Sequence, residues 1–148
     1  MKQNINRLKL IGKNIEDLKT ISAYCQDSIV KIKDLVYLKK NKIFVIMANR
    51  FMWEDLEKGV FRKFKRIKCV LKFNFVNSVL SKNINQNQKN RNLELLAIKS
   101  NYKDNHLYEI SLIFSGNSFL LLESDEIDVM LDELEFFWEV KKSPKHKV

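Results

Sequence analysis

An acidic run near the end of the chain, residues 123–139, constrains the fold more than any other feature. It holds eight acidic residues and no basic one, although the whole chain carries a formal net charge of +9. Its apolar residues recur at helical spacing, and they are Ile127, Met130, Leu131, Leu134 and Trp138. An apolar stripe with acids on the opposite side predicts an amphipathic helix that covers a larger apolar surface.

The chain before this run supplies such a surface, because most of it predicts β-strands. Segments rich in β-branched, aromatic or alternating apolar residues are residues 8–12, 29–38, 42–53, 67–75, 93–100, 107–114 and 119–123. Polar turns join the second to the third of these segments and the sixth to the seventh, so each pair predicts a hairpin.

One further helix is predicted after the first strand. Asn14 suits its N-cap, Asp17 follows three residues later, and the helix runs to about Gln26. Its apolar stripe consists of Ile15, Leu18, Ile21 and Cys25.

The order of these elements predicts an α+β fold in a single domain, residues 1–148. About seven strands would form an antiparallel meander, bent or closed into an open barrel, with one helix after the first strand and one C-terminal capping helix. The strand count is similar to that of pleckstrin-homology-like barrels. The Asn-rich residues 83–92 predict a mobile loop, residues 54–63 a turn or loop, and residues 141–148 a loose tail.

Composition bears on location and on partners. No apolar stretch reaches the length of a signal peptide or membrane span, and Cys25 and Cys69 lack metal-ligand neighbours, so we expect a cytoplasmic protein with two buried, reduced thiols. The positive charge favours anionic partners. However, 22 of the 27 basic residues are lysines, and 15 residues are asparagines, which also fits the codon usage of an AT-rich genome.

Two clusters are candidate binding sites, and the first lies around the end of the strand at residues 42–53. Arg50 could bind a carboxylate or phosphate through two hydrogen bonds, beside Asn49 and Trp53, with Asp27 orienting it. The structural alternative is that Arg50 pairs with Glu54 or an acid of the terminal helix, and that Trp53 packs in the core.

The second cluster is a basic segment that could bind RNA or single-stranded DNA. It contains Arg62, Lys63, Lys65, Arg66 and Lys68, with phenylalanines nearby. In a strand, however, the residues Ile67, Cys69, Leu71, Phe73 and Phe75 share one face and the lysines the other. That alternation separates charge from stacking surface and favours a solvated strand over a core.

No catalytic or metal motif stands out. His106 and His146 are 40 residues apart without ligand spacing, and no GxSxG motif occurs. We therefore expect no metal and no cofactor, and an enzyme remains possible only through an isolated carboxylate such as Glu54 or Glu109.

Several short segments resemble a bacterial family of unknown function, number 2948, found mainly in alphaproteobacteria. They are residues 8–11, 16–18, 21–28, 37–38, 49–51, 53–54, 95–98 and 114–116, together with Trp138, Pro144 and His146. The resemblance implies a single-domain bacterial cytoplasmic protein and supplies no catalytic residues.

These observations together predict a small binding or interaction module. Its partner would be a protein or a small anionic ligand at Arg50, Asn49, Trp53 and Asp27, and the alternative is nucleic-acid binding through residues 62–72.

Overall fold

The computed structural model describes residues 8–51, 65–104 and 106–139, with the backbone alone for Lys65 and residues 135–139. Its elements in chain order are β1 (Lys9–Gly12), α1 (Ile15–Cys25), β2 (Ser28–Lys31), the 3₁₀ turn η1 (Ile32–Asp34), β3 (Leu35–Leu38), the 3₁₀ turn η2 (Lys39–Asn41), β4 (Ile43–Phe51), β5 (Lys65–Phe73), β6 (Val76–Lys82), β7 (Asn92–Lys103), β8 (Leu107–Phe114), β9 (Ser118–Ser124) and β10 (Val129–Glu139). No helix in these ranges is long and apolar enough to cross a membrane.

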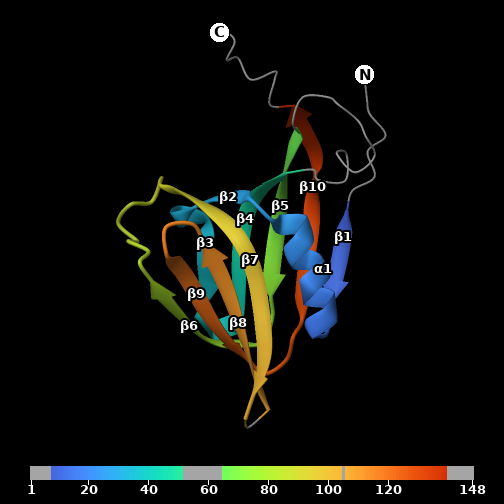
Figure 1. Cartoon of the computed structure of the whole chain (residues 1–148), viewed down its shortest axis with the longest axis vertical. Helices are drawn as coiled ribbons and strands as arrows, with labels where there is room; N and C mark the ends of the chain where they lie inside the picture. Colours follow the sequence, from blue (N-terminus) through green and yellow to red (C-terminus); the bar gives the residue numbers. More distant parts are fainter. Residues whose placement is uncertain (1–7, 52–64, 105, 140–148) are drawn as a thin grey trace.

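The ten strands form one antiparallel sheet. Their order is β1-β10-β5-β4-β2-β7-β8-β9-β6, and β3 pairs with β4 outside this path. The sheet curls strongly, so that β7, β8 and β9 face the wall made by β4, β5 and β10, with β2 between the two walls (Figure 1). A bent antiparallel sheet, as predicted, is therefore the architecture, and we call its curled form the barrel.

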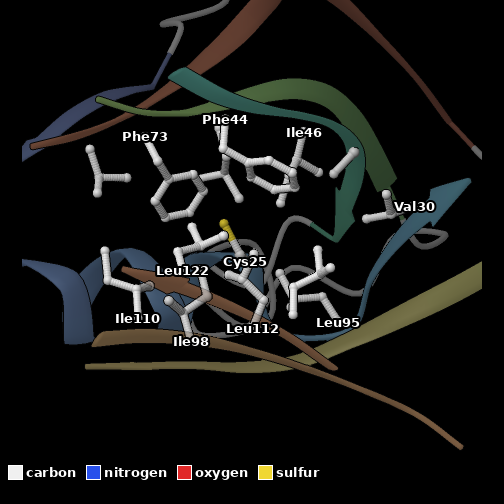
Figure 2. Packing of buried hydrophobic residues seen from close by; sticks show 14 of the residues in the cluster. Cys25, Val30, Phe44, Ile46, Phe73, Leu95, Ile98, Ile110, Leu112 and Leu122 are labelled. Atoms are coloured by element: carbon white, nitrogen blue, oxygen red, sulfur yellow. The ribbon is translucent and has the colours of Figure 1, made fainter. Parts of the chain in front are cut away.

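The core lies between these two walls. Figure 2 shows Phe44, Ile46 and Phe73 facing side chains of the opposite wall, which include Ile98, Ile110, Leu112 and Leu122. Each of these side chains is at most 3% exposed. The alternation of buried and solvent-facing residues along each strand therefore places one continuous apolar layer inside the barrel.

Helix α1 packs beside β7 and β1 (Figure 1). Its N-cap is Asn14, as predicted, because the side chain of Asn14 accepts a hydrogen bond of 2.8 Å from the backbone N–H of Asp17. Leu18, Ile21 and Cys25 of the predicted stripe are buried against the sheet. The helix thus covers an open side of the barrel.

Both predicted hairpins are present. β3 pairs with β4 around η2, and β8 pairs with β9 around a turn in which Gly116 and Asn117 have positive φ of 76° and 57°. Glycine and asparagine tolerate this conformation best, so this turn has the residues that its backbone needs.

The predicted C-terminal capping helix is wrong, because residues 129–139 form strand β10. This strand lies between β1 and β5, with Leu131 aligned with Leu10 on one side and Leu71 on the other. Val129, Leu131 and Glu133 point inward and are at most 2% exposed. The inward acid Glu133 interrupted the apolar alternation, so the sequence showed a helical spacing in place of a strand pattern.

The predicted number of seven strands is also too small. The three additional strands are β10, the edge strand β6, and one that arises because η1 divides the predicted strand at residues 29–38 into β2 and β3. The pleckstrin-homology-like picture depended on the capping helix and is not confirmed. The predicted loop at residues 54–63 and the tail at 141–148 lie outside the described residues.

Candidate functional site

Arg50, the centre of the predicted ligand site, lies in the protein core. Its side chain is 0% exposed and forms an ion pair with Glu133 of β10, in which Nε donates to Oε2 over 2.8 Å. Nη1 donates to the backbone carbonyls of Phe51, at 3.1 Å, and Tyr24, at 3.3 Å. The guanidinium also lies 5.4 Å from the centroid of the Tyr24 ring. Arg50 therefore joins β4, β10 and the end of α1.

Glu133 extends this network to Leu8, the residue before β1. Its Oε1 accepts a hydrogen bond of 2.8 Å from the backbone N–H of Leu8, and its own backbone N–H donates to the carbonyl of Leu8. The buried acid is thus satisfied from both sides, as a buried charge requires. The structural alternative was that Arg50 pairs with an acid of the predicted terminal helix. Glu133 belongs to that acidic run, but the run forms a strand.

Two other residues of the predicted ligand site, Asn49 and Asp27, contact Arg66. Asn49 precedes Arg50 in β4, so its side chain is on the opposite face of the sheet. Arg66 Nη1 donates to the backbone carbonyls of Asn49, at 3.1 Å, and Asp27, at 3.2 Å. The hydrogen bond with the Asp27 side chain raises the pKa of the Glu94 carboxyl. Trp53 lies outside the described residues, and the binding role of the four residues stays a prediction.

The structure describes only part of the basic segment. Arg62 and Lys63 lie outside the described residues, and Lys65 is described by its backbone alone. In β5 the inward residues Ile67, Cys69, Leu71 and Phe73 are 0% exposed, while Lys68 and Lys72 alternate with them. The prediction that Phe75 shares this inward face is wrong. Phe75 follows β5 in a turn, has a φ of 61° and is 41% exposed. Lys68 and Lys72 are therefore on the opposite face of β5 from Phe73, whereas Arg66 lies beside the ring of Phe51.

A cleft that the sequence did not predict lies between two strand edges. Among the described strands, β3 pairs only with β4 and β6 only with β9, so the edges of β3 and β6 leave a seam in the barrel. The cavity in this seam measures about 510 Å³. We call it the seam cleft, and its lining comprises Ile32, Lys33, Leu35, Tyr37, Phe44, Val79, Ser81, Ile84, Gln86, Lys89 and Leu120.

Hydrogen bonds hold both ends of the seam cleft. At one end, Tyr37 Oη donates to the carbonyl of Val76 over 2.8 Å, and the N–H of Val76 donates to the carbonyl of Lys42. At the other end, the N–H of Lys33 donates to the carbonyl of Lys89 over 2.9 Å. The Tyr37 bond joins β3 to β6, and the Lys33 bond joins η1 to the segment at residues 83–92, so the seam cleft is built into the fold.

The Asn-rich segment forms one wall of this cleft. Besides the Lys33 bond, Ile32 N–H of η1 donates to the carbonyl of Arg91 over 3.0 Å, which fastens the segment to η1. Ile84, the one apolar residue in the predicted loop at 83–92, packs against the core from there. Two sequence features could have indicated this wall of the cleft. One is the lone apolar residue in a polar run, and the other is the polar pair Lys33-Asp34 that interrupts the predicted strand at residues 29–38.

The charges that line the seam cleft have one sign. Lys33 and Lys89 are the charged residues of its lining within the described chain, and both are exposed at the rim. Apolar and aromatic side chains, among them Ile32, Leu35 and Tyr37, line the cleft together with the polar side chains of Ser81 and Gln86. An apolar cavity with a few convergent polar groups is the usual form of a small-ligand site, and here those groups attract anions.

Comparison with known proteins assigns the chain to a family. The family DUF2948, described as a protein of unknown function, matches residues 8–146. The chain belongs to this family. No curated protein matches it, and no solved structure does either. The DUF2948 match includes both strands of the seam, the wall at residues 83–92 and the pair of Arg50 with Glu133, so each of these features lies in the family domain.

Candidate metal ligands and His106 have defined positions in the described part of this DUF2948 chain. Within residues 8–51, 65–104 and 106–139, no three His, Cys, Asp or Glu side chains gather where they could hold a metal ion. His106 sits beside Tyr102, with 3.2 Å between the Tyr102 hydroxyl and His106 Nδ1, at the exposed tip of the β7–β8 hairpin.

The two thiols of the chain are buried next to the Arg50 network. Both cysteines are free and 0% exposed. Burial raises the pKa of Cys25 from 9.0 to about 12, and burial raises that of Cys69 well above 9.0. Because the thiolate is the reactive form, neither thiol is a nucleophile at neutral pH.

We therefore expect the folded protein to resist alkylation. Iodoacetamide at pH 8 should leave both cysteines unmodified, and the same reagent in a denaturing concentration of urea should modify both, as intact mass spectrometry would show. The wild-type protein in urea is its own control for reagent activity. Rapid modification of Cys25 in the native protein would contradict the buried placement.

Proposed function

We propose that this DUF2948 protein is a non-catalytic binding module that takes a small anionic ligand in the seam cleft. The observation that carries the proposal is a cavity of about 510 Å³ that combines apolar side chains such as Leu35 and Tyr37 with a rim whose charges are the two lysines Lys33 and Lys89. Cavities of about 300–1,000 Å³ are the usual size for small ligands. The positive net charge of the chain would steer anions toward this rim.

The closed ends of the seam cleft favour a small ligand over a protein segment. A peptide strand added between β3 and β6 would have to leave the cleft at both ends. The bond from Tyr37 to Val76 obstructs one end, and that from Lys33 to Lys89 the other. A protein partner therefore suits this cleft less well than a compact anion does.

Nucleic-acid binding through the basic segment remains the alternative. In the described part of that segment, Arg66 is engaged with two backbone carbonyls and lies 5.7 Å from the Phe51 ring centroid. Those contacts leave fewer donors for phosphates. The alternative would show itself as RNA binding that weakens steeply with salt and that does not respond to substitutions in the seam cleft.

The protein also fits a bacterial cytoplasm, which we propose as its location. Two free, buried cysteines suit a compartment that keeps thiols reduced. The segments that resemble the alphaproteobacterial members of the family support a bacterial source.

A titration with 1-naphthalenesulfonate, a small amphipathic anion, tests the proposed site. At about 0.3 kcal/mol per heavy atom, this probe would bind with a Kd on the order of 1 mM. We expect its ¹H–¹⁵N chemical-shift changes to concentrate at Tyr37, Val79 and Ile84. The substitution Val79→Trp should fill the cleft and weaken binding at least about tenfold, because Val79 lines it and strands accept tryptophan.

The matched control is Leu80→Trp. Leu80 is the next residue of β6, is 66% exposed and does not line the cleft, so this substitution should leave the affinity unchanged. Equal loss of binding in both variants, or shift changes centred away from β3 and β6, would refute the site.

A further inference from the structure

The two ends of the seam cleft differ in chemistry. Toward the Tyr37–Val76 bond, the lining includes Tyr37 and Phe44, whose ring centroids are 6.5 Å apart. The Tyr37 hydroxyl already donates to the Val76 carbonyl, so the ring offers its apolar body to the cleft. Toward the other end, the backbone bond between Lys33 and Lys89 places the origins of two cationic side chains together. The cleft therefore runs from an apolar end to a cationic end.

We infer that the ligand is an amphipathic monocarboxylate of medium chain length. This inference rests on the proposed function and names the ligand class of the same site. The carboxylate would lie between the ammonium groups of Lys33 and Lys89, and the apolar chain would extend toward Tyr37 and Phe44 between the walls of β3 and β6.

The charges in the lining favour a single anionic head group. No acidic side chain belongs to the described lining, so an amine or a zwitterion would find no partner for its cation. A phosphate is usually held by the planar fork of arginine or by several backbone N–H groups. Here the cationic groups are two flexible lysines, each a point charge, which suits one carboxylate.

The length of the cleft indicates the length of the chain. Tyr37 and Lys33 are four residues apart, across β3 and the end of η1. At a rise of about 3.3 Å per strand residue, this separation is at most roughly 13 Å. An extended carboxylate of octanoate or decanoate size spans a comparable distance. A long-chain fatty acid is longer than the cleft and would not fit between its two ends.

Isothermal titration calorimetry with hexanoate, octanoate, decanoate and hexadecanoate tests this inference. We expect affinity to rise by up to about fourfold for each added methylene while the chain is being buried, and to stop rising near decanoate. The neutral analogue 1-octanol should bind at least about tenfold more weakly than octanoate, because it lacks the charge that the lysines attract.

Charge substitutions supply the second measurement. The double variant Lys33→Gln with Lys89→Gln should weaken octanoate binding about tenfold and leave 1-octanol unchanged. The matched control is Lys72→Gln with Lys99→Gln, which alters the net charge equally at two positions outside the lining and should leave octanoate affinity unchanged.

Four results would overturn the inference, and they separate it from the proposed function. If 1-octanol binds as tightly as octanoate, or if both double variants weaken octanoate equally, the lysines do not hold a carboxylate. If octanoate fails to bind while 1-naphthalenesulfonate binds in the cleft, the ligand class is wrong and the anion site stands. If neither anion binds, the proposed function itself is wrong.

Discussion

Replacing Arg50 by alanine is expected to lower the free energy of unfolding by about 3–5 kcal/mol, because the substitution leaves Glu133 charged and buried without its partner. Glu133 is 2% exposed, so water cannot take the place of the guanidinium. The carbonyls of Tyr24 and Phe51 would lose a donor at the same time. Urea denaturation followed by circular dichroism would measure the loss.

The control for this prediction is Arg66→Ala. Arg66 is half-buried on the outer face of β5 and donates to two carbonyls, so we expect a loss of about 1–2 kcal/mol, at a net contribution of about 0.5–1 kcal/mol for each hydrogen bond. A third variant, Arg50→Met with Glu133→Leu, replaces the pair by apolar side chains and should recover most of the stability that Arg50→Ala removes.

This experiment also separates the two roles of Arg50 that the sequence left open. If Arg50→Ala unfolds at the wild-type urea concentration and loses binding of an anion, the guanidinium serves a ligand. If it unfolds at a much lower concentration, Arg50 holds β4, β10 and the end of α1 together. The fully buried ion pair favours the second result.

Local sequence signals predicted much of the fold. Asn14 capped α1 as expected, the β3–β4 and β8–β9 hairpins formed, and Phe73 with the other alternating residues of β5 pointed inward. Each of these features is decided by neighbouring residues, through capping, turn chemistry or period-two alternation.

The error at β10 arose from an interaction across the chain. At its inward position Glu133 pairs with Arg50, which lies 83 residues earlier. The sequence pattern of a single segment places every acid in solvent. With Glu133 placed there, the apolar residues around it matched the spacing of a helix. The buried partner could be known only after the pairing of β4, β5 and β10.

The seam cleft was missed for a related reason. Its lysines, Lys33 and Lys89, come from segments more than fifty residues apart. A backbone hydrogen bond brings them together, and such a bond does not depend on the identity of either side chain. The cleft also exists because β3 and β6 stop short of pairing, and the edges of strands are set by the curl of the whole sheet.

The second large effect is expected at Leu131. The substitution Leu131→Ala should lower the free energy of unfolding by about 2–5 kcal/mol, because Leu131 is 0% exposed in a strand with neighbours on both sides and the cavity would not be refilled. Met130→Ala is the control, and we expect a loss of no more than about 1 kcal/mol, since Met130 is half-buried on the opposite face.

The comparison decides between a strand and a helix for this part of the chain. In the helix that the sequence predicted, Met130 and Leu131 belong to the same apolar stripe, so truncating either would cost a similar amount. In β10 they point to opposite faces, so the two losses should differ severalfold when urea midpoints are compared at equal m-values. Equal losses at the two positions would favour the helix and would remove the strand that carries Glu133 to Arg50.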